Sequence, residues 1–317
     1  MKIGIVIGPW GHSMEETIAT MRTTEERGFH SWHMGDHFFS VNQIDSIEPY
    51  LLLALAARET ERVRIGPFVT PVMFRPPSNV GRLAAQLDLL SGGRFVMGLG
   101  AGWHPGEHAA YGVDYPSIGE RFDRLDEYIQ VMRAMWGEGP ASFEGRFYRL
   151  QEADVRPKPA PGRPTVLIAG GGEKRTLRLV AKHAHEWNCV DLTPDGYRRK
   201  CEILAGYCDE IGRDPGEIRH TMMTMGLIGT TEEALEAEAA LQMLRRAPPG
   251  PMSAADYLAQ QRGRSAVIMG SPDEMVDKIG RLGEAGIDEI VFIWFSLSST
   301  AVPDWLASNV LPQVGDL

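Results

Sequence analysis

The sequence predicts an α/β fold, a TIM (β/α)8 barrel with insertions after strands 4 and 7, formed as one domain over residues 1–317. Short apolar runs alternate with helix-like stretches, which is typical of parallel strands joined by helical crossovers. Eight such runs occur, the strand number of a TIM barrel. A length of 317 residues exceeds that of a minimal barrel and leaves room for insertions. A doubly wound open sheet is the alternative.

The first third of the chain contains four of the expected strands. We expect strands at 2–7, 31–35, 63–70 and 95–99, and helices at 13–28, 48–60 and 78–90. Ser13 and Glu16 have the spacing of a capping box at the start of the first helix. Gly92 and Gly93 end the third helix. The run before Gly100 is continuously apolar, which indicates a strand that is covered on both faces.

The alternation breaks after Gly102. We expect a long loop at 104–115, an amphipathic helix at 118–136, and a hairpin at 141–150 with its turn at Glu144-Gly145. Four prolines between 157 and 164 then form a stiff connector.

The second half resumes the alternation. We expect strands at 165–169, 186–190, 218–227 and 289–294, and helices at 173–183, 195–211, 231–243 and 302–310. Ser271 and Glu274 again have capping-box spacing at the start of a further helix. Residues 245–263 contain Pro and Gly and are expected as an irregular excursion. This excursion and the 104–115 loop are expected to shape the substrate pocket.

Composition narrows the class of protein. The net charge is -10 and the pI about 5.4, which argues against binding to nucleic acid or to an anionic membrane. The three cysteines are too few and too scattered for a disulfide framework. The start of the chain does not resemble a signal peptide, and no apolar run approaches the roughly 18 residues of a membrane helix. We therefore expect a cytoplasmic protein.

Candidate chemical groups follow the expected strands. Asp36 and His37 end the second strand and offer a carboxylate beside an imidazole, which titrates near neutral pH and suits proton transfer. The alternative is that Asp36 caps the next loop and His37 bonds to backbone. The glycine-rich turn after the fourth strand delivers Trp103 and Glu107, and its spacing is not that of a dinucleotide-binding fingerprint.

The turn after the fifth strand reads GGGEKRT, from Gly170 to Thr176. A strand, a glycine turn and a helix start present backbone N–H groups and a positive helix end, with Lys174 and Arg175 nearby, which suits a phosphate. The alternative is a glycine turn with exposed basic residues.

No metal site is expected. His104 to His108 matches the H-x-x-E-H string of zinc enzymes, but that string needs a continuous helix, which Pro105 and Gly106 disfavour.

Aromatic residues gather near the expected strand ends, where a flat apolar cofactor would use several of them. They are Trp10, Trp32, Phe38, Phe39, Trp103, Tyr111 and Trp294. Core positions are the better interpretation for Trp32 and Trp294.

A series of motifs occurs in a fixed order over roughly residues 1–215. They are SWHMGDH (31–37), RIGPFVTP (64–71), LDLLSGGRFVMGLGAGW (87–103), EHAAYG (107–112), GERFDRLDE (119–127), FEGRFYRL (143–150), IAGGGEKRTLRLVA (168–181) and HEWN (185–188). In these motifs the chain resembles the luciferase-like monooxygenase superfamily, specifically its coenzyme F420-dependent oxidoreductases.

The resemblance implies a cofactor lying across the carboxyl ends of the barrel strands. His37 and Glu107 would be catalytic. The cofactor-binding residues would be Asp36, His37, Phe68, Val69, Ala101, Gly102, Trp103, Ala169, Gly170, Gly171, Gly172, Arg175 and Thr176. The peptide between Phe68 and Val69 would be the family's non-proline cis peptide. Trp103 stands where some sugar-phosphate-oxidising members carry a glutamate, which argues against that activity.

Three functions follow. The first is an oxidoreductase that transfers a hydride between F420 and an unknown small organic substrate, with His37 managing the proton. The second is an FMN-dependent monooxygenase that uses O2. The third is a cofactor-binding protein without turnover. A homodimer is expected by family analogy.

Overall fold

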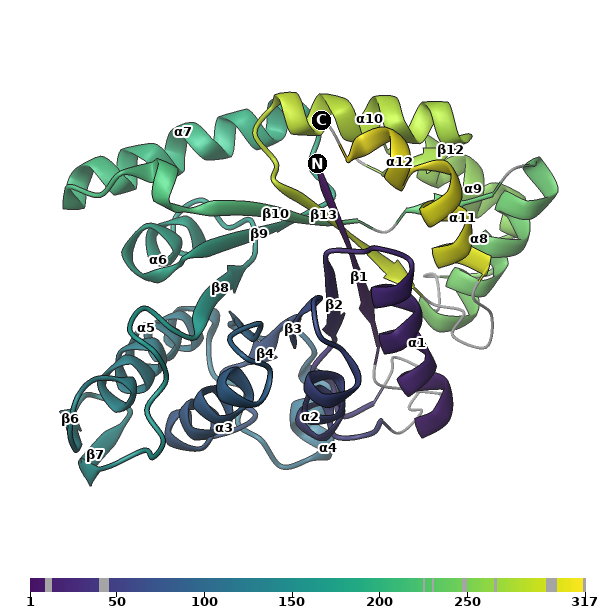
Figure 1. The fold of residues 1–317 in the computed structure, drawn as a ribbon. Coiled ribbons are helices and arrows are strands. Elements are labelled where there is room, and N and C mark those ends of the chain that lie inside the picture. The colour runs from purple at the N-terminus through teal and green to yellow at the C-terminus, as the bar shows by residue number, and fades with distance from the viewer. Residues whose placement is uncertain are drawn as a thin grey trace.

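The computed structural model describes residues 1–8, 13–39, 46–224, 226–229, 231–246, 250–264, 267–294 and 301–315. In these residues a parallel sheet with the order β3-β2-β1-β13-β10-β9-β8-β5-β4 is surrounded by helices (Figure 1). A bridge between Ile65 of β3 and Phe95, the residue before β5, closes this sheet. Because β4 continues the path of β3 after a short break, the nine strands form an eight-stranded barrel. The TIM-barrel prediction is confirmed.

The barrel strands are short and mostly buried. They are β1 (Lys2–Ile7), β2 (Ser31–Met34), β3 (Arg64–Pro67), β4 (Thr70–Pro71), β5 (Val96–Gly100), β8 (Thr165–Ala169), β9 (Glu186–Val190), β10 (Arg219–Thr224) and β13 (Glu289–Trp294). Their apolar side chains, with those of the surrounding helices, form one large core. Burial on both faces explains why these strands are continuously apolar in the sequence.

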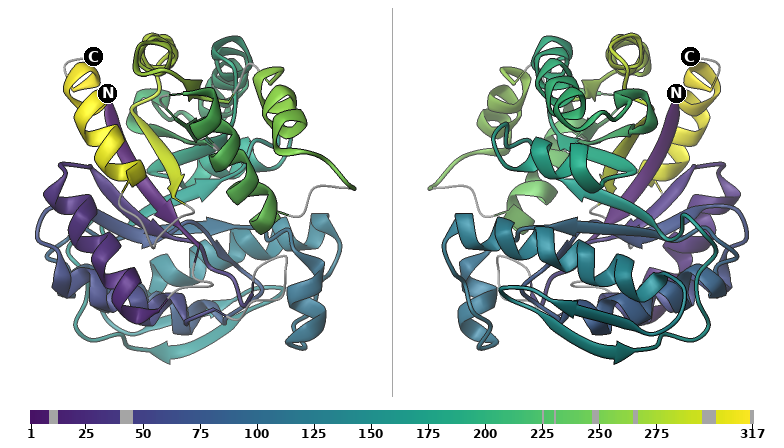
Figure 2. Two further views of the ribbon diagram at one scale, coloured as in Figure 1. Left: turned by 90° about the vertical axis from the view of Figure 1, so that its right-hand side faces the viewer. Right: turned by 90° about the vertical axis from the view of Figure 1, so that its left-hand side faces the viewer.

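Helices cover the outside of the barrel, as the two views in Figure 2 show. They are α1 (Met14–Glu26), α2 (Pro49–Glu59), α3 (Pro77–Leu90), α5 (Ile118–Trp136), α6 (Thr176–His183), α7 (Pro194–Ile211), α10 (Pro272–Glu284), α11 (Ala301–Asn309) and α12 (Leu311–Val314), with a 3-10 turn η1 (Pro215–Glu217). The capping boxes predicted at Ser13 and Ser271 are both present, each closed by the glutamate three residues on.

Two insertions interrupt the barrel where they were expected. After β5, the fourth barrel strand, come α4 (Pro105–Ala110), then α5 and a hairpin of β6 (Ala141–Glu144) and β7 (Arg149–Ala153). After β10, the seventh barrel strand, come β11 (Leu227–Ile228), α8 (Glu232–Arg246), α9 (Ala254–Arg262) and β12 (Met269–Gly270). This second group, green in Figures 1 and 2, has a small core of its own.

Several expectations about local structure are wrong. The 104–115 loop contains the helix α4, because Pro105 occupies the first turn, where its missing N–H costs nothing, and the His104 ring accepts the Glu107 N–H. The 245–263 excursion contains α9, capped by Ser253. The helix expected from residue 173 begins only at Thr176. The third strand is divided between β3 and β4, and the seventh ends at residue 224.

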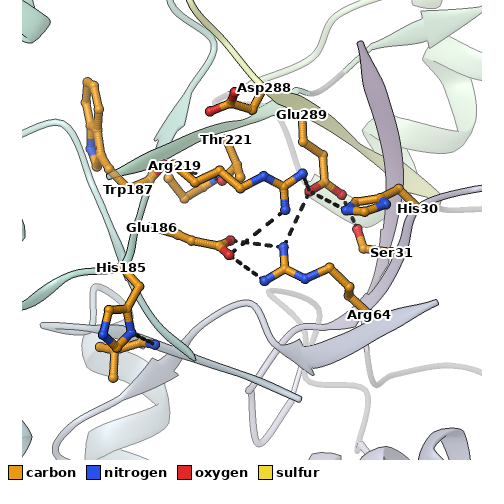
Figure 3. Close-up of polar contacts among 12 residues, drawn as sticks. His30, Ser31, Arg64, His185, Glu186, Trp187, Arg219, Thr221, Asp288 and Glu289 are labelled. Atoms are coloured by element: carbon orange, nitrogen blue, oxygen red, sulfur yellow. Dashed lines mark hydrogen bonds and ion pairs between the residues drawn. The ribbon is translucent and has the colours of Figure 1, made fainter. Parts of the chain in front are cut away.

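A cluster of charged residues closes the amino-terminal end of the barrel (Figure 3). Its members are the first residues of their strands, and we call them the closed-end cluster: Ser31, Arg64, Glu186, Arg219 and Glu289. In Figure 3 the two guanidinium groups lie between the two carboxylates. Arg219 pairs with Glu289 at 3.0 Å, and Arg64 pairs with Glu186 and lies 3.9 Å from Glu289. The cluster therefore balances its own charge.

Two further residues belong to the surroundings of this cluster. A Cβ atom on Gly4 would overlap Ser31 Oγ and Glu289 Oε1, so glycine on β1 leaves the space in which these two groups bond. Burial and then the positive charges of Arg219 and Arg64 lower the pKa of His30 to about 4, so this imidazole is neutral at pH 7.

Candidate active site at the carboxyl ends of the strands

An imidazole and a buried carboxylate meet beside the carboxyl end of β2. His37 follows this strand, and Glu107 lies in α4; His37 Nδ1 and Glu107 Oε2 are 2.8 Å apart. The second oxygen of Glu107 accepts the backbone N–H of Phe38 at 2.6 Å and that of Phe39 at 3.4 Å. Burial raises the pKa of Glu107, but the bonds from His37 and from the two N–H groups outweigh it and lower this pKa overall. Glu107 is therefore an ionised acceptor at neutral pH.

This contact fixes the state of the His37 ring. A carboxylate can only accept, so Nδ1 of His37 carries a proton and Nε2 is the basic nitrogen of the neutral imidazole. The alternative expectation, in which His37 serves backbone groups, is thus replaced at Nδ1 by a bond to a side-chain carboxylate. The His37 side chain keeps 18% of its surface exposed, whereas Glu107 keeps 1%.

Asp36 is buried and belongs to a different network from its neighbour His37. Its Oδ2 accepts from Thr70 Oγ1 and from Arg75 Nη1, each at 2.7 Å. The hydroxyl of Tyr50 lies 2.9 Å from that of Thr70. Burial raises the pKa of Asp36 despite the lowering effect of Arg75. The alternative expectation is that Asp36 caps the next loop, but its partners are the side chains of Thr70 and Arg75.

The peptide bond between Phe68 and Val69 is cis, at the break between β3 and β4, as the resemblance implied. The neighbouring strand β5 accommodates this break through its glycines. A Cβ on Gly100 would lie 2.9 Å from Val69 Cγ2, and one on Gly98 would overlap the carbonyl oxygen of Pro67. These two glycines therefore allow the chain at Pro67 and Val69 to pack closely against β5.

Ala101, Gly102 and Trp103 form the turn that follows β5. Gly102 has a φ of +78°, in the left-handed region that favours glycine. Trp103 is 63% exposed. It stands edge-on to the His37 ring, with the ring centroids 5.8 Å apart. The turn thus places an exposed aromatic side chain next to the His37–Glu107 pair.

A possible anion site follows β8. Ala169 ends the strand, Gly170 has a φ of +129°, and Gly171 and Gly172 are exposed. The N-cap residue of α6 is Arg175, and no side chain in the described part of the chain caps this helix start. A Cβ on Gly172 would lie 2.9 Å from the hydroxyl oxygen of Thr176, so the glycine keeps this space open. Uncapped N–H groups, a hydroxyl and a basic residue fit a phosphate.

The histidines of the H-x-x-E-H string have separate partners. His104 Nδ1 accepts the Glu107 N–H, and His108 Nδ1 lies 2.8 Å from the carbonyl oxygen of Asp114. Among the described residues, no group of three His, Cys, Asp or Glu side chains is placed to hold a metal ion.

The structure brings the predicted site residues to the carboxyl ends of four barrel strands: β2, the β3–β4 pair, β5 and β8. Phe38 stacks on Phe74 and on Tyr111, at centroid distances of 4.2 and 4.3 Å. Trp32 and Trp294 are buried in the core, as interpreted from the sequence. Trp10 lies outside the described residues.

Sequence reasoning missed the residues that support the site from behind. Thr70, Arg75 and Tyr50 surround Asp36, and Arg121 and Tyr115 hold the turn at Trp103. Two of them occur in motifs that carried the resemblance, Thr70 in RIGPFVTP and Arg121 in GERFDRLDE. Their place in these motifs was the only indication that they matter, and it did not show which residues they contact.

A TIM barrel with polar and aromatic groups at the carboxyl ends of its strands has the architecture of an enzyme active site. The profile of the luciferase-like monooxygenase family matches residues 1–289. The chain belongs to this family and is an enzyme of the oxidoreductase and monooxygenase class that the family comprises.

The curated relatives that this chain resembles over part of its length are called pyrimidine monooxygenases. The pyrimidine monooxygenase RutA of Escherichia coli (strain SMS-3-5 / SECEC) is 30% identical over 200 residues, which cover 61% of this chain and 53% of RutA. RutA of Allorhizobium ampelinum is 27% identical over 197 residues, covering 60% of this chain and 52% of its own. The matched segment thus spans about half the length of these curated relatives.

Two solved structures show the same fold. An F420-dependent secondary alcohol dehydrogenase in complex with an F420-acetone adduct has a TM-score of 0.82 at 20% identity, covering 99% of this chain and 98% of its own. Monooxygenase RslO1 from Streptomyces bottropensis has a TM-score of 0.81 at 23% identity, covering 98% and 99%. In the described part of the chain, no helix has both the length and the apolar character needed to cross a bilayer.

Proposed function

We propose that this protein is an F420-dependent oxidoreductase that transfers a hydride between the deazaflavin and a small organic substrate. The observation that carries the proposal is the hydrogen bond between His37 Nδ1 and the buried Glu107, at the carboxyl ends of the strands. This pair supplies a basic nitrogen of defined tautomer where a cofactor and substrate would meet.

The residues present fit such a cofactor. The glycine turn at 170–172, the uncapped start of α6 and the hydroxyl of Thr176 would hold its phosphate. The ring would lie among Asp36, Phe68, Val69, Ala101, Gly102 and Trp103. The cofactor would supply hydride transfer at one ring carbon.

The protein's own groups would handle the proton. Glu107 orients the His37 ring, because its carboxylate accepts the Nδ1 proton at 2.8 Å. Nε2 would take a proton from the substrate hydroxyl during oxidation and return it during reduction. The aromatic side chains around this pair would exclude water.

Basic residues near the anion site favour F420 over FMN. Lys174 and Arg175 are exposed, and neither pairs with a carboxylate among the described residues. F420 extends beyond its phosphate into a carboxylate-bearing tail, whereas FMN ends at the phosphate. Two unpaired cations beside the phosphate position therefore suit the longer anion.

An FMN-dependent monooxygenase is the second candidate. The sequence relatives named pyrimidine monooxygenase and the RslO1 structure favour it. The two functions differ in oxygen use, because reduced FMN reacts readily with O2 and reduced deazaflavin poorly. A homodimer, a cytoplasmic location and a single domain remain predictions.

The test is a side-by-side fluorescence titration of the purified protein with FMN and with F420. We expect tight binding of F420 and weaker binding of FMN. Arg175→Ala should weaken F420 binding about tenfold, as loss of a charge-assisted phosphate contact does. Arg178→Ala is the matched control, because this exposed arginine lies on the same helix and pairs with Glu210 at 3.3 Å.

Preferential FMN binding, with O2 consumption by the reduced complex, would replace the proposal by the monooxygenase. Binding of neither cofactor would remove both. Tight F420 binding without hydride exchange with any donor would leave a binding protein without turnover.

A further inference from the structure

The turn that presents Trp103 is held on both sides of this residue. The Arg121 guanidinium, in the first turn of α5, donates from Nη1 to the carbonyl oxygen of Gly102 at 2.6 Å. The Tyr115 hydroxyl donates to the carbonyl oxygen of Trp103 at 3.2 Å. These carbonyls belong to the peptide groups before and after Trp103. Its backbone therefore has one contact fixing each flanking peptide.

The two holding residues also contact each other. The Arg121 guanidinium carbon lies 3.9 Å from the centre of the Tyr115 ring, a cation–π arrangement. Arg121 is only 6% exposed, and within the described residues it forms no ion pair with a carboxylate. A buried cation is costly unless other groups compensate its charge. Here the carbonyl dipoles of the turn and the Tyr115 ring do so, which ties the cation to this turn.

The side chain of Trp103 contrasts with its fixed backbone. The residue is 63% exposed, although the peptide groups beside it are held from within the protein. It stands edge-on to His37 on one side and contacts the ring of His104 at 5.0 Å. An exposed indole on a fixed turn, next to a candidate catalytic imidazole, is arranged to pack against a flat ring.

We propose that Arg121 and Tyr115 are positioning residues, which fix the peptide groups flanking Trp103 so that its indole packs against a planar ring system bound beside His37. The ligand class is a planar conjugated ring. The inference rests on the proposed function in one respect: FMN and F420 are the planar rings with which it is tested.

The first experiment observes Trp103 without any ligand. The protein is labelled with 5-fluorotryptophan, and the resonance missing from Trp103→Phe identifies residue 103. We expect Tyr115→Phe and Arg121→Met each to shift and sharpen this resonance while those of the other tryptophans stay in place. Tyr115→Phe keeps the ring over Arg121 and removes only the hydroxyl, so it remains informative where Arg121→Met fails to fold. Tyr111→Phe is the matched control.

The second experiment is a double-mutant cycle on binding. Trp103→Ala should weaken binding of the preferred cofactor about tenfold, and Tyr115→Phe about threefold, as loss of one hydrogen bond does. If Tyr115 acts through Trp103, adding Tyr115→Phe to Trp103→Ala should change the dissociation constant by less than about 1.5-fold. The melting temperatures of the two single variants report the fold independently.

The outcomes separate the two proposals. Additive effects of Tyr115→Phe and Trp103→Ala, or an unmoved residue 103 resonance in Tyr115→Phe, would overturn the positioning role even if F420 binds tightly. A moved resonance in a protein that binds neither FMN nor F420 would retain the positioning role and reject the proposed function.

Discussion

The two ends of the barrel use buried charge in different ways. At the amino-terminal end, the closed-end cluster pairs two arginines with two glutamates that all start barrel strands. At the carboxyl-terminal end, the buried carboxylates of Glu107 and Asp36 bond to groups that follow the strands. In the first arrangement the positive and negative charges neutralise one another, whereas the second includes a partly exposed imidazole.

This difference indicates that the closed end of the barrel contributes to stability and the carboxyl-terminal end to chemistry. Charges that satisfy each other between strands hold the strands in register and face no ligand. Charges that orient His37, whose side chain is 18% exposed, lie where a bound molecule would meet the ring. Substitutions at the closed end should therefore change the free energy of unfolding, and substitutions at the open end should change turnover.

The largest expected effect separates the two histidines. His37→Ala should lower turnover about 10²- to 10⁴-fold, because it removes the proton-transfer group, with the cofactor dissociation constant changed less than about threefold. His30→Gln at the closed end should leave turnover per folded molecule unchanged. Steady-state rates, with a substrate found by screening, and cofactor titrations measure both. Unchanged turnover in His37→Ala would remove His37 from the mechanism.

The second effect tests the closed end. Glu289→Gln should destabilise the fold by about 3 kcal/mol, because it leaves Arg219 and Arg64 partly uncompensated in a buried site. Urea denaturation measures this change. Glu144→Gln is the matched control: its pair with Arg149 is exposed, and its loss should cost about 0.5 kcal/mol or less. Equal effects at the two positions would show that the cluster adds nothing beyond a surface pair.

The third effect is a dependence on pH. The pKa of His30 is lowered to about 4 in the folded protein, against about 6.5 when unfolded, so the unfolded chain binds more protons between these values. Stability from this neutral ring is complete above about pH 6.5 and falls as the pH drops toward 4, by about 2 kcal/mol after allowance for its partial exposure. Denaturation at pH 4 to 7 should show a flatter profile for His30→Gln. Parallel profiles for the two proteins would contradict this.

The smallest effect tests the close packing of β5 against Val69. Gly100→Ala should cost about 1 to 2 kcal/mol, because its new methyl group meets Val69 Cγ2. Val69→Ala should relieve this clash, so the double variant should lose less than the sum of the two single losses. A Cβ on Gly98 also lies 2.9 Å from Val69 Cγ1, but its overlap with the backbone oxygen of Pro67 stays when Val69 is shortened, so Gly98→Ala should gain less from the same partner change. Thermal unfolding of the parent, the three single variants and the two double variants with Val69→Ala decides between these outcomes.

Sequence patterns predicted the barrel because its strands are buried on both faces and its helices carry recognisable caps. The capping boxes at Ser13 and Ser271 marked two helices correctly. Ser253 with Asp256 carries a comparable signal for α9, which the Pro and Gly content of that segment obscured. Pro105 was interpreted as a helix breaker, although a proline in the first turn favours a helix start.

The candidate site was harder to predict, because its contacts join residues far apart in the sequence. The pairing of His37 with Glu107 spans 70 positions, and that of Asp36 with Arg75 spans 39. Local patterns indicate which residue types follow a strand, but not which of them meet. The space beside Gly98 and Gly100 is likewise used by distant residues, Pro67 at the end of β3 and Val69 in the break before β4.

The absent side chain of Gly4 sets a rule for how this sequence can change over evolutionary time. Any larger residue at position 4 meets two groups at once, on Ser31 and on Glu289, and these already bond to each other. A single substitution there disrupts an arrangement that spans three strands. We expect homologues with a larger residue at position 4 to differ at 31 and 289 as well, so that the three positions are inherited as a unit.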